Sequence, residues 1–335
     1  MSNPKNRFEG VSYHPVDDFP PRLRIQYLAD ATKSIISYND SPDVGFSASI
    51  NIYRGCAHGC SYCYARPTHE YLGFSCGNDF ESKIMVKHNA PELLRNELNK
   101  KSWSPQVLAM SGVTDTYQPI EHRLKLTRRC LEVLADFCNP VVIVTKNALV
   151  VRDIDVLSTL ARMNGCIVYV SITTLDPQLS RKMEPRASLP RQRLAAVAAL
   201  AESGVPVGVL VAPIVPGLND SEIPSILESV ADAGACTASY VMLRLPFAVK
   251  DVFSGWLDEH FPLRKAKVLN HVRGVRNGEL NKSQFGERMR GTGPFAEHIA
   301  RLFAVSRHKY GLDRPGPALS TEHFRRVDAG QLDLF

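Results

Sequence analysis

The stretch SINIYRGCAHGCSYCYARP, residues 49–67, places three cysteines within eight positions: Cys56, Cys60 and Cys63. This Cys-x3-Cys-x2-Cys spacing on a short loop directs three thiolates toward one metal centre. A closed structural zinc site uses four ligands, and a cubane iron–sulfur cluster normally uses four cysteines. Three thiolates leave one coordination position open, which indicates chemistry rather than a purely structural role. The alternative is a structural zinc ion with a fourth ligand from His58, His69 or Cys76.

Six short, apolar and β-branched runs predict strands at residues 48–55, 107–112, 141–147, 167–172, 205–213 and 238–246. Amphipathic helical patterns separate successive runs. Near-continuous apolar strands joined by crossover helices predict a parallel sheet that is buried on both faces. The chain has six such strand–helix units, whereas a complete TIM barrel has eight. We therefore predict an α/β fold of the partial (β/α)6 TIM-barrel type. Such barrels carry their sites at the C-terminal ends of the strands, and the cysteine loop directly follows the first strand.

The same patterns divide the chain into four parts. Residues 1–45 contain the breakers FPPRLR and NDSPD, which predict an irregular lead-in. The barrel is expected to occupy residues 46–250. Residues 251–312 are basic and predict a mainly helical C-terminal extension. Residues 313–335 predict a flexible linker and tail.

The composition is that of a globular protein, with 44% hydrophobic and 22% charged residues. No run approaches about 18 uncharged apolar residues, so we expect no membrane span. The N-terminal stretch MSNPKNRFEG lacks the apolar core of a secretory signal. We therefore expect a cytoplasmic protein whose cysteines stay reduced, which favours metal binding or burial over disulfides.

The positive charge is concentrated in one segment, residues 264–290. Eight basic residues there face only Glu279 and Glu287, so the segment carries 8 − 2 = +6, which equals the formal net charge of the chain. Such a segment predicts a polyanionic partner, with DNA as the expected one. The alternative is a solvated helical face. The predicted phosphate contacts are Arg264, Lys265, Lys267, Arg273, Arg276, Lys282, Arg288 and Arg290.

The cysteine loop, with Tyr62 just before its last cysteine, resembles the radical SAM signature. Together with SGVTDTYQPIEHRLKLTRRCLE, residues 111–132, the longer run resembles the spore photoproduct lyase-like branch, also described as DNA repair photolyases. The resemblance implies that Cys56, Cys60 and Cys63 bind a [4Fe–4S] cluster. It also implies that S-adenosylmethionine (SAM) chelates the open iron, which would account for the absent fourth ligand. Reductive cleavage of SAM would then give a 5′-deoxyadenosyl radical, with an electron donor such as flavodoxin or ferredoxin.

The resemblance also implies SAM contacts at the strand ends. Asp115 would meet the methionyl amino group, although the usual Gly-Gly-Glu form is absent. Lys146 and Ser171 resemble the ribose and carboxylate contacts of the lyase-like branch, and Arg186 would pair with the SAM carboxylate. The full set of implied contacts is Tyr62, Ser111, Gly112, Thr114, Asp115, Thr145, Lys146, Ser171, Thr173, Arg186, Pro213 and Ile214.

The substrate side departs from that branch, in which a dedicated cysteine returns hydrogen to the product radical. No cysteine lies between Cys76 and Cys130, which disfavours thymine-dimer reversal specifically. Cys76 is the loop candidate for a redox role, and Tyr117 is a candidate pocket residue. We expect the other cysteines to pack in the interior: Cys130, Cys138, Cys166 and Cys236.

The tail QLDLF, residues 331–335, resembles the pentapeptide by which bacterial DNA polymerases and repair proteins bind the replication sliding clamp. Gln331 would form hydrogen bonds, Leu334 and Phe335 would fill an apolar pocket, and Leu332 would add contact area. The alternative is a tail that folds back on its own protein.

Together these features predict a radical SAM enzyme that acts on DNA and is recruited by the sliding clamp. A first alternative keeps the radical chemistry but changes the substrate to tRNA, a peptide or a small molecule. A second alternative is a non-catalytic metal-binding module that docks on the clamp.

Overall fold

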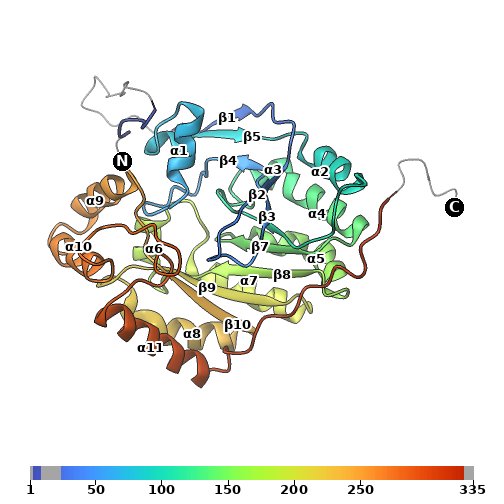
Figure 1. Cartoon of the computed structure of the whole chain (residues 1–335). Coiled ribbons are helices and arrows are strands. Elements are labelled where there is room, and N and C mark those ends of the chain that lie inside the picture. Colours follow the sequence, from blue (N-terminus) through green and yellow to red (C-terminus); the bar gives the residue numbers. More distant parts are fainter. Residues whose placement is uncertain (1–2, 9–23, 328–335) are drawn as a thin grey trace.

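The computed structural model describes residues 3–8 and 24–327. Its centre is a seven-stranded sheet with the order β10-β9-β8-β7-β6-β3-β2 (Figure 1). Six strands are parallel, and β2 pairs antiparallel with β3 at one edge. The strands are β2 (Ile36–Tyr38), β3 (Ala48–Ile50), β6 (Leu108–Met110), β7 (Val141–Thr145), β8 (Cys166–Ser171), β9 (Val207–Ile214) and β10 (Thr237–Met242).

Helices connect these strands and cover the sheet. Side chains such as Val168, Val170 and Val209 are fully buried, as expected for strands that are covered on both faces. The predicted α/β partial-barrel fold is confirmed. The helices are η1 (Arg66–Leu72), α1 (Asn78–Ser82), α2 (Ala90–Asn99), α3 (Glu121–Leu124), α4 (Leu126–Phe137), η2 (Ala148–Asp153), α5 (Ile154–Ala161), α6 (Pro177–Met183), α7 (Pro190–Glu202), η3 (Asp220–Glu222), α8 (Ile223–Asp232), α9 (Val249–His260), α10 (Lys265–Gly274) and α11 (Pro294–Lys309).

The N-terminal region is more ordered than the sequence predicts. Besides β2, it contributes β1 (Gln26–Ala29), which pairs in parallel with β5 (Lys83–Val86). The predicted strand at 48–55 is divided into β3 and β4 (Tyr53–Arg54), and β4 joins β5 in the small sheet β1-β5-β4. Between them the Asn51 side chain accepts a hydrogen bond from the Val113 amide (3.0 Å), which turns the chain from one sheet to the other.

The segment between α10 and α11 covers the free edge of β10. The Met242 amide donates to the Met289 carbonyl (2.8 Å), and the Arg290 guanidinium donates to the Tyr240 carbonyl (3.0 Å). Arg288 of this segment pairs with Asp43, which lies in the loop between β2 and β3 at the other end of the sheet order. The two edges of the open barrel are therefore bridged through side chains rather than by strand pairing.

Residues 313–335 were predicted as a flexible linker and tail. The described part of this region together with Leu312, residues 312–327, is here named the strap, and its backbone is bonded to the barrel. The strap runs past the N-terminal ends of the strands: the Leu312 carbonyl accepts from Ala238, and the amide of Ser320 donates to Asn164. Farther along, the amide of Arg325 donates to the Phe137 carbonyl (2.9 Å). The backbone groups of this Pro/Gly-containing segment therefore find partners on the barrel, which holds it in place.

No helix within the described residues is long and apolar enough to cross a bilayer.

Replacing Phe324 tests the packing of the strap. Its half-buried ring lies 6.3 Å from the Phe137 ring, so Phe324→Ala should lower the free energy of unfolding by about 1–2 kcal/mol. Leu263→Ala is the matched control, since this side chain is 99% exposed and should change stability by less than about 0.5 kcal/mol. Anaerobic urea denaturation measures both. Equal midpoints for the two variants would contradict a packed strap.

Candidate functional site

The cysteine loop lies beside the C-terminal ends of β6, β7 and β8. Its three cysteines line a cavity of about 110 Å3 together with Tyr64 and the strand-end residues. The cavity brings together seven of the predicted SAM contacts: Ser111, Gly112, Thr114, Asp115, Thr145, Lys146 and Ser171. Residues from four separate segments of the chain therefore converge on one site, as the barrel rule predicts.

The thiols are free and largely buried. Burial, followed by the charges of Asp115 and the neighbouring thiols, raises the pKa of Cys56 well above its usual range. Burial and Glu184 raise the pKa of Cys60 to about 12. The buried thiols of Cys56 and Cys60 are held in their neutral form unless a cationic partner binds them, and this donor set fits an iron–sulfur cluster.

The geometry disfavours the zinc alternative. Within residues 3–8 and 24–327, no group of three His, Cys, Asp or Glu side chains is arranged to hold a single metal ion. A cubane instead takes one thiolate on each iron. Two of the three proposed fourth zinc ligands lie away from the cavity: His69 Nε2 bonds to the Lys83 carbonyl (2.9 Å), and Cys76 does not line the cavity. The third, His58, lines it and contacts Asp115.

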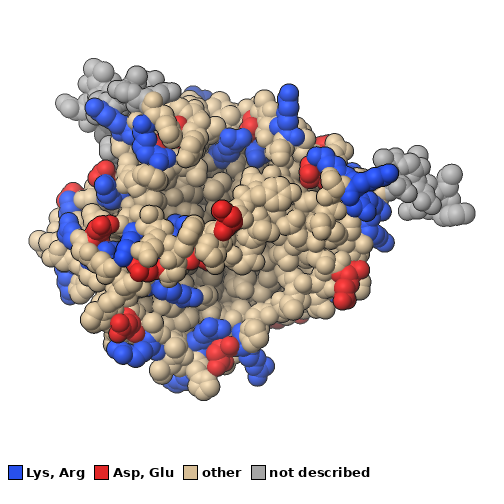
Figure 2. All heavy atoms as spheres, viewed as in Figure 1, with Lys and Arg blue, Asp and Glu red and all other residues tan. Residues whose placement is uncertain are grey.

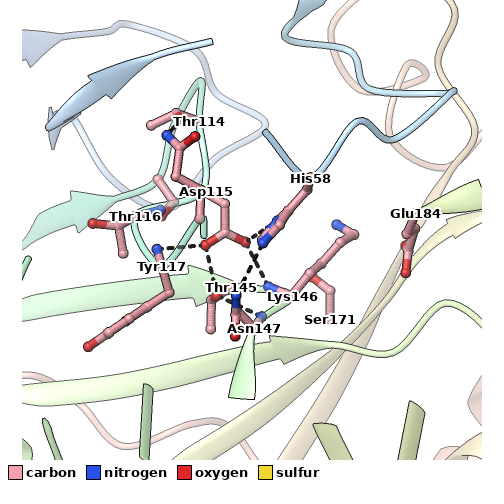
Figure 3. A network of polar contacts seen from close by, with 12 residues as sticks. His58, Thr114, Asp115, Thr116, Tyr117, Thr145, Lys146, Asn147, Ser171 and Glu184 are labelled. Atoms are coloured by element: carbon pink, nitrogen blue, oxygen red, sulfur yellow. Dashed lines mark hydrogen bonds and ion pairs between the residues drawn. The ribbon is translucent and has the colours of Figure 1, made fainter. Parts of the chain in front are cut away.

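A first carboxylate, Asp115, fixes the loop through His58 (Figure 3). Its oxygens accept from Thr145 Oγ1 (2.8 Å), from the Lys146 amide (2.8 Å) and from the Tyr117 amide (2.9 Å), and His58 Nδ1 lies 3.4 Å away. Burial alone would raise the pKa of Asp115, but His58 and these amides lower it to about 2. Asp115 therefore positions the loop, a role that the sequence did not predict.

The hydrogen bonds of Asn147 identify the tautomer of His58. Its Oδ1 accepts from the Leu149 amide (3.0 Å) and from Ser188 Oγ (3.1 Å), so its Nδ2 must be the donor to His58 Nε2 (3.3 Å). Nδ1, which faces Asp115, is therefore the nitrogen that carries a proton.

A second carboxylate, Glu184, holds the other half of the loop. It accepts hydrogen bonds from the Tyr62 hydroxyl and from Thr173 Oγ1 (2.6 Å), and it pairs with buried Arg193. Burial would raise the pKa of Glu184, but the Arg193 guanidinium lowers it below its usual value. Tyr62 and Thr173, predicted as SAM contacts, thus lie in a network that supports the loop. Sequence analysis missed Glu184 and Arg193, because nothing local marks a buried ion pair.

A third carboxylate, Glu81, lies between two arginines. Arg66 donates to Glu81 (3.3 Å) and to the Cys60 carbonyl (3.0 Å), and Arg186 pairs with Glu81 and donates to the Ala57 carbonyl. Both guanidiniums therefore tie backbone carbonyls of the cysteine loop to α1. The structure places Arg186, a predicted partner of the SAM carboxylate, in this loop-binding network.

Both predicted catalytic residues lie outside the cavity, and these predictions are wrong. Cys76 is fully buried, and burial raises the pKa of its thiol to about 12, so it is no reactive loop cysteine. Tyr117 is also buried; its ring points away from His58 and its hydroxyl donates to Asp153 (3.1 Å) (Figure 3).

Pro213 and Ile214 were predicted to offer backbone contacts to adenine. In the structure the Pro213 carbonyl accepts from the Asn219 side chain (3.0 Å), and the Ile214 carbonyl accepts from the Leu243 amide (2.9 Å). Both carbonyls therefore already bond within the fold.

Figure 2 shows basic and acidic side chains interleaved on the face toward the viewer. The eight basic residues of the segment 264–290 differ in their surroundings. Arg276 is a correction: it is buried, donates to the Met242, Leu243 and Glu287 carbonyls, and cannot contact a phosphate. Three other members form ion pairs: Lys265 with Asp258, Lys282 with Glu287, and Arg288 with Asp43. Arg290 lies over the Tyr240 ring, and Arg273 bonds to Asn270. Arg264 and Lys267 are exposed, with no ion pair among the described residues.

The predicted clamp peptide, 331–335, lies outside the described residues.

Comparison with known proteins agrees with this site. Residues 50–230 match the Radical SAM superfamily. The chain is 35% identical to the uncharacterized protein Rv2578c of Mycobacterium tuberculosis over 317 residues, which cover 93% of this chain and 85% of the relative. It is 30% identical to the uncharacterized protein MJ0683 of Methanocaldococcus jannaschii over 213 residues, 64% of this chain and 76% of the relative.

The chain belongs to the radical SAM superfamily. Its fold resembles the solved structure of spore photoproduct lyase complexed with dinucleoside spore photoproduct, with a TM-score of 0.61 at 17% identity. That likeness covers 85% of this chain and 79% of the other. The protein is accordingly an enzyme whose cofactors are a [4Fe–4S] cluster and SAM.

Cys56, Cys60 and Cys63 are the residues that would hold the radical SAM cluster. When bound, the cluster and SAM supply a 5′-deoxyadenosyl radical that removes hydrogen from a substrate. The chain contributes orientation: three carboxylate networks fix the loop, and the strand ends present Ser111, Lys146 and Ser171 at the cavity. Cys56, Cys60 and Ser171 are buried in this lining, while Tyr64 is exposed.

Gly59 provides a test of the loop geometry. It has φ of +69°, and a Cβ there would overlap the Arg186 and Glu81 side chains. Gly59→Ala should therefore disrupt this network and reduce the iron retained per protein several-fold. Gly204→Ala is the control, because Gly204 has a similar φ of +73° but no atom within 4 Å of the added carbon. It should cost only about 1–2 kcal/mol of strain and keep its iron. Iron and sulfide analysis compares them, and full iron in Gly59→Ala would contradict the role of the network.

Proposed function

We propose that this radical SAM enzyme acts on DNA, repairing a lesion or modifying a base. The main supporting observation is the extent of the likeness to spore photoproduct lyase. The superfamily match covers residues 50–230, whereas the structural likeness covers 85% of this chain, so it includes elements outside the shared radical SAM region. The lyase was solved with a dinucleoside spore photoproduct, which makes nucleic acid the first substrate class to consider.

The proposed reaction differs from spore photoproduct reversal. Among the described residues, the cavity contains no thiol besides the three loop cysteines. A reaction that uses a further protein cysteine as hydrogen donor would therefore find no such donor in this cavity. We therefore propose a reaction in which the radical removes hydrogen from a nucleotide whose base has left the stack, without hydrogen return from a protein thiol.

The chain's own residues would orient this reaction. Lys146 is the cation of the cavity that can meet the ribose side of SAM, and its Nζ lies 5.9 Å from the centre of the Tyr62 ring. Ser171 and Ser111 offer hydroxyls at neighbouring strand ends. The electron that starts SAM cleavage would come from an external donor such as flavodoxin or ferredoxin.

We also propose that the tail recruits the enzyme to the replication sliding clamp. The peptide QLDLF at 331–335 contains one amide anchor and three apolar side chains, a pattern suited to a small apolar pocket. The strap that precedes it is bound to the barrel, with Arg326 donating to the Trp103 carbonyl (3.2 Å). A peptide attached there would reach its partner without displacing the cysteine loop.

The substrate class can be tested by SAM turnover. Reconstituted, anaerobically reduced enzyme should cleave SAM to 5′-deoxyadenosine faster with damaged DNA than with tRNA or buffer. With SAM deuterated at the 5′ carbon, mass spectrometry shows which substrate exchanges hydrogen with the SAM-derived product. Stimulation by tRNA alone would replace DNA with RNA as substrate. Absence of any SAM cleavage would favour the non-catalytic metal-binding module.

Deletion of residues 331–335 tests recruitment. The truncated enzyme should lose clamp binding in surface plasmon resonance but keep its rate of SAM cleavage. The double variant Leu334→Ala, Phe335→Ala should behave like the deletion, because both apolar anchors are lost. Clamp binding that persists in either variant would exclude the tail as the docking peptide.

A further inference from the structure

Exposed aromatic rings lie on the cysteine loop and on the segments that follow β10 and α10. Tyr64 follows the last loop cysteine, lines the cavity and is 48% exposed. Phe247, in the loop after β10, is 57% exposed, and Phe285, in the segment after α10, is 52% exposed. Large exposed rings are uncommon on a protein surface and mark binding sites where they cluster.

Each of these rings is held by an arginine. Arg244 lies over Tyr64 (5.1 Å to the ring centre), Arg288 over Phe285 (4.4 Å) and Arg7 over Phe247 (3.8 Å). The hydroxyl of Tyr64 also donates to the Gly112 carbonyl (2.7 Å), which fixes this ring between the cysteine loop and β6. The rings are therefore oriented in advance, although they remain exposed.

Arg244 is the member of this group whose charge is not balanced. Arg7 pairs with Glu70, and Arg288 pairs with Asp43. No carboxylate among the described residues forms an ion pair with Arg244, whose polar contact is to Met289 Sδ (3.6 Å). Burial lowers the pKa of Arg244, and the charge of Arg288 lowers it further, against opposing effects of Tyr64 and Asp43. A half-buried guanidinium between other guanidiniums is therefore a site for an anion.

The loop that carries Arg244 also carries Phe247 in a strained conformation. Phe247 has φ of +50°, in the left-handed region that bulky residues rarely adopt. Such a conformation costs on the order of 1–3 kcal/mol and persists where the surroundings enforce it, often at ligand-binding sites. Here it accompanies a ring that is 57% exposed beside Arg7, rather than one buried in the core.

We propose that Arg244, Tyr64, Phe247 and Phe285 bind an unpaired nucleotide of single-stranded or locally opened DNA. The guanidinium of Arg244 contacts the phosphate, and the exposed rings stack against bases. This inference rests on the proposed DNA substrate and adds the site that receives it. One unbalanced cation among exposed rings matches a nucleotide, which combines one negative charge with a flat aromatic base. A peptide carboxylate would match the cation but would leave several rings without a partner.

The test measures binding of a fluorescein-labelled single-stranded 12-nucleotide DNA and its duplex by anisotropy, using anaerobic reconstituted enzyme with SAM. The salt concentration is varied from about 50 to about 200 mM. The wild-type enzyme should bind the single strand more tightly than the duplex. Arg244→Gln should weaken single-strand binding about tenfold and reduce the log–log salt slope by about 0.7, since one phosphate contact is lost. Phe285→Ala should weaken binding about fivefold without changing the slope, since stacking carries no counterion release.

Arg314→Gln is the matched control: Arg314 is an exposed arginine of the strap, past the opposite ends of the strands. It removes the same charge and should change neither affinity nor slope. Iron content confirms that each variant is folded and loaded. If wild-type enzyme binds DNA but Arg244→Gln behaves like Arg314→Gln, this site is wrong while the DNA substrate stands. If wild-type enzyme binds neither form of DNA, the proposed function fails, and the inference fails with it.

Discussion

The structure depends on holding three largely buried thiols in a convergent arrangement on a loop that has no regular secondary structure of its own. Glu81, Asp115 and Glu184 provide this constraint from three different elements. Glu81 and Glu184 are buried and paired with arginines, and buried Asp115 is held by His58 and by backbone amides, so each carboxylate has polar partners in the interior. Breaking one pair would leave its partner charged in the interior. The loop is therefore held by interactions that are costly to disrupt individually.

The barrel brings together the polar strand-end residues that lie beside the cysteine loop. Parallel strands end at one edge of the sheet, so short polar segments after β6, β7 and β8 meet although they are distant in sequence. The same edge carries Arg244, just beyond β10. The residues that line the cavity and the residues proposed to bind the substrate are thus positioned by the same parallel strands.

Much of the fold could be predicted from sequence, because buried strands and amphipathic helices follow local periodicity. The metal ligands could be predicted because their spacing is local as well. The carboxylate–arginine pairs that hold the cysteine loop could not be predicted. Glu81 and Arg186 are 105 residues apart, and no short-range pattern marks them as partners. For the same reason Arg276 resembled a surface charge in sequence, although it donates to carbonyls of a strand end more than 30 residues away. The contacts of the strap likewise join segments that are remote along the chain.

The strap has a consequence for the order in which the protein acquires its structure. Arg326 bonds to the Lys100 carbonyl, 226 residues earlier, and Arg288 meets Asp43, 245 residues earlier. A chain emerging from the ribosome presents the cysteine loop long before either contact can form. Contacts between residues so far apart slow folding, because the intervening chain loses conformational entropy before the contacts form. These two contacts can therefore form only after nearly all of the chain has been synthesised, whereas every residue that holds the cysteine loop lies before residue 194.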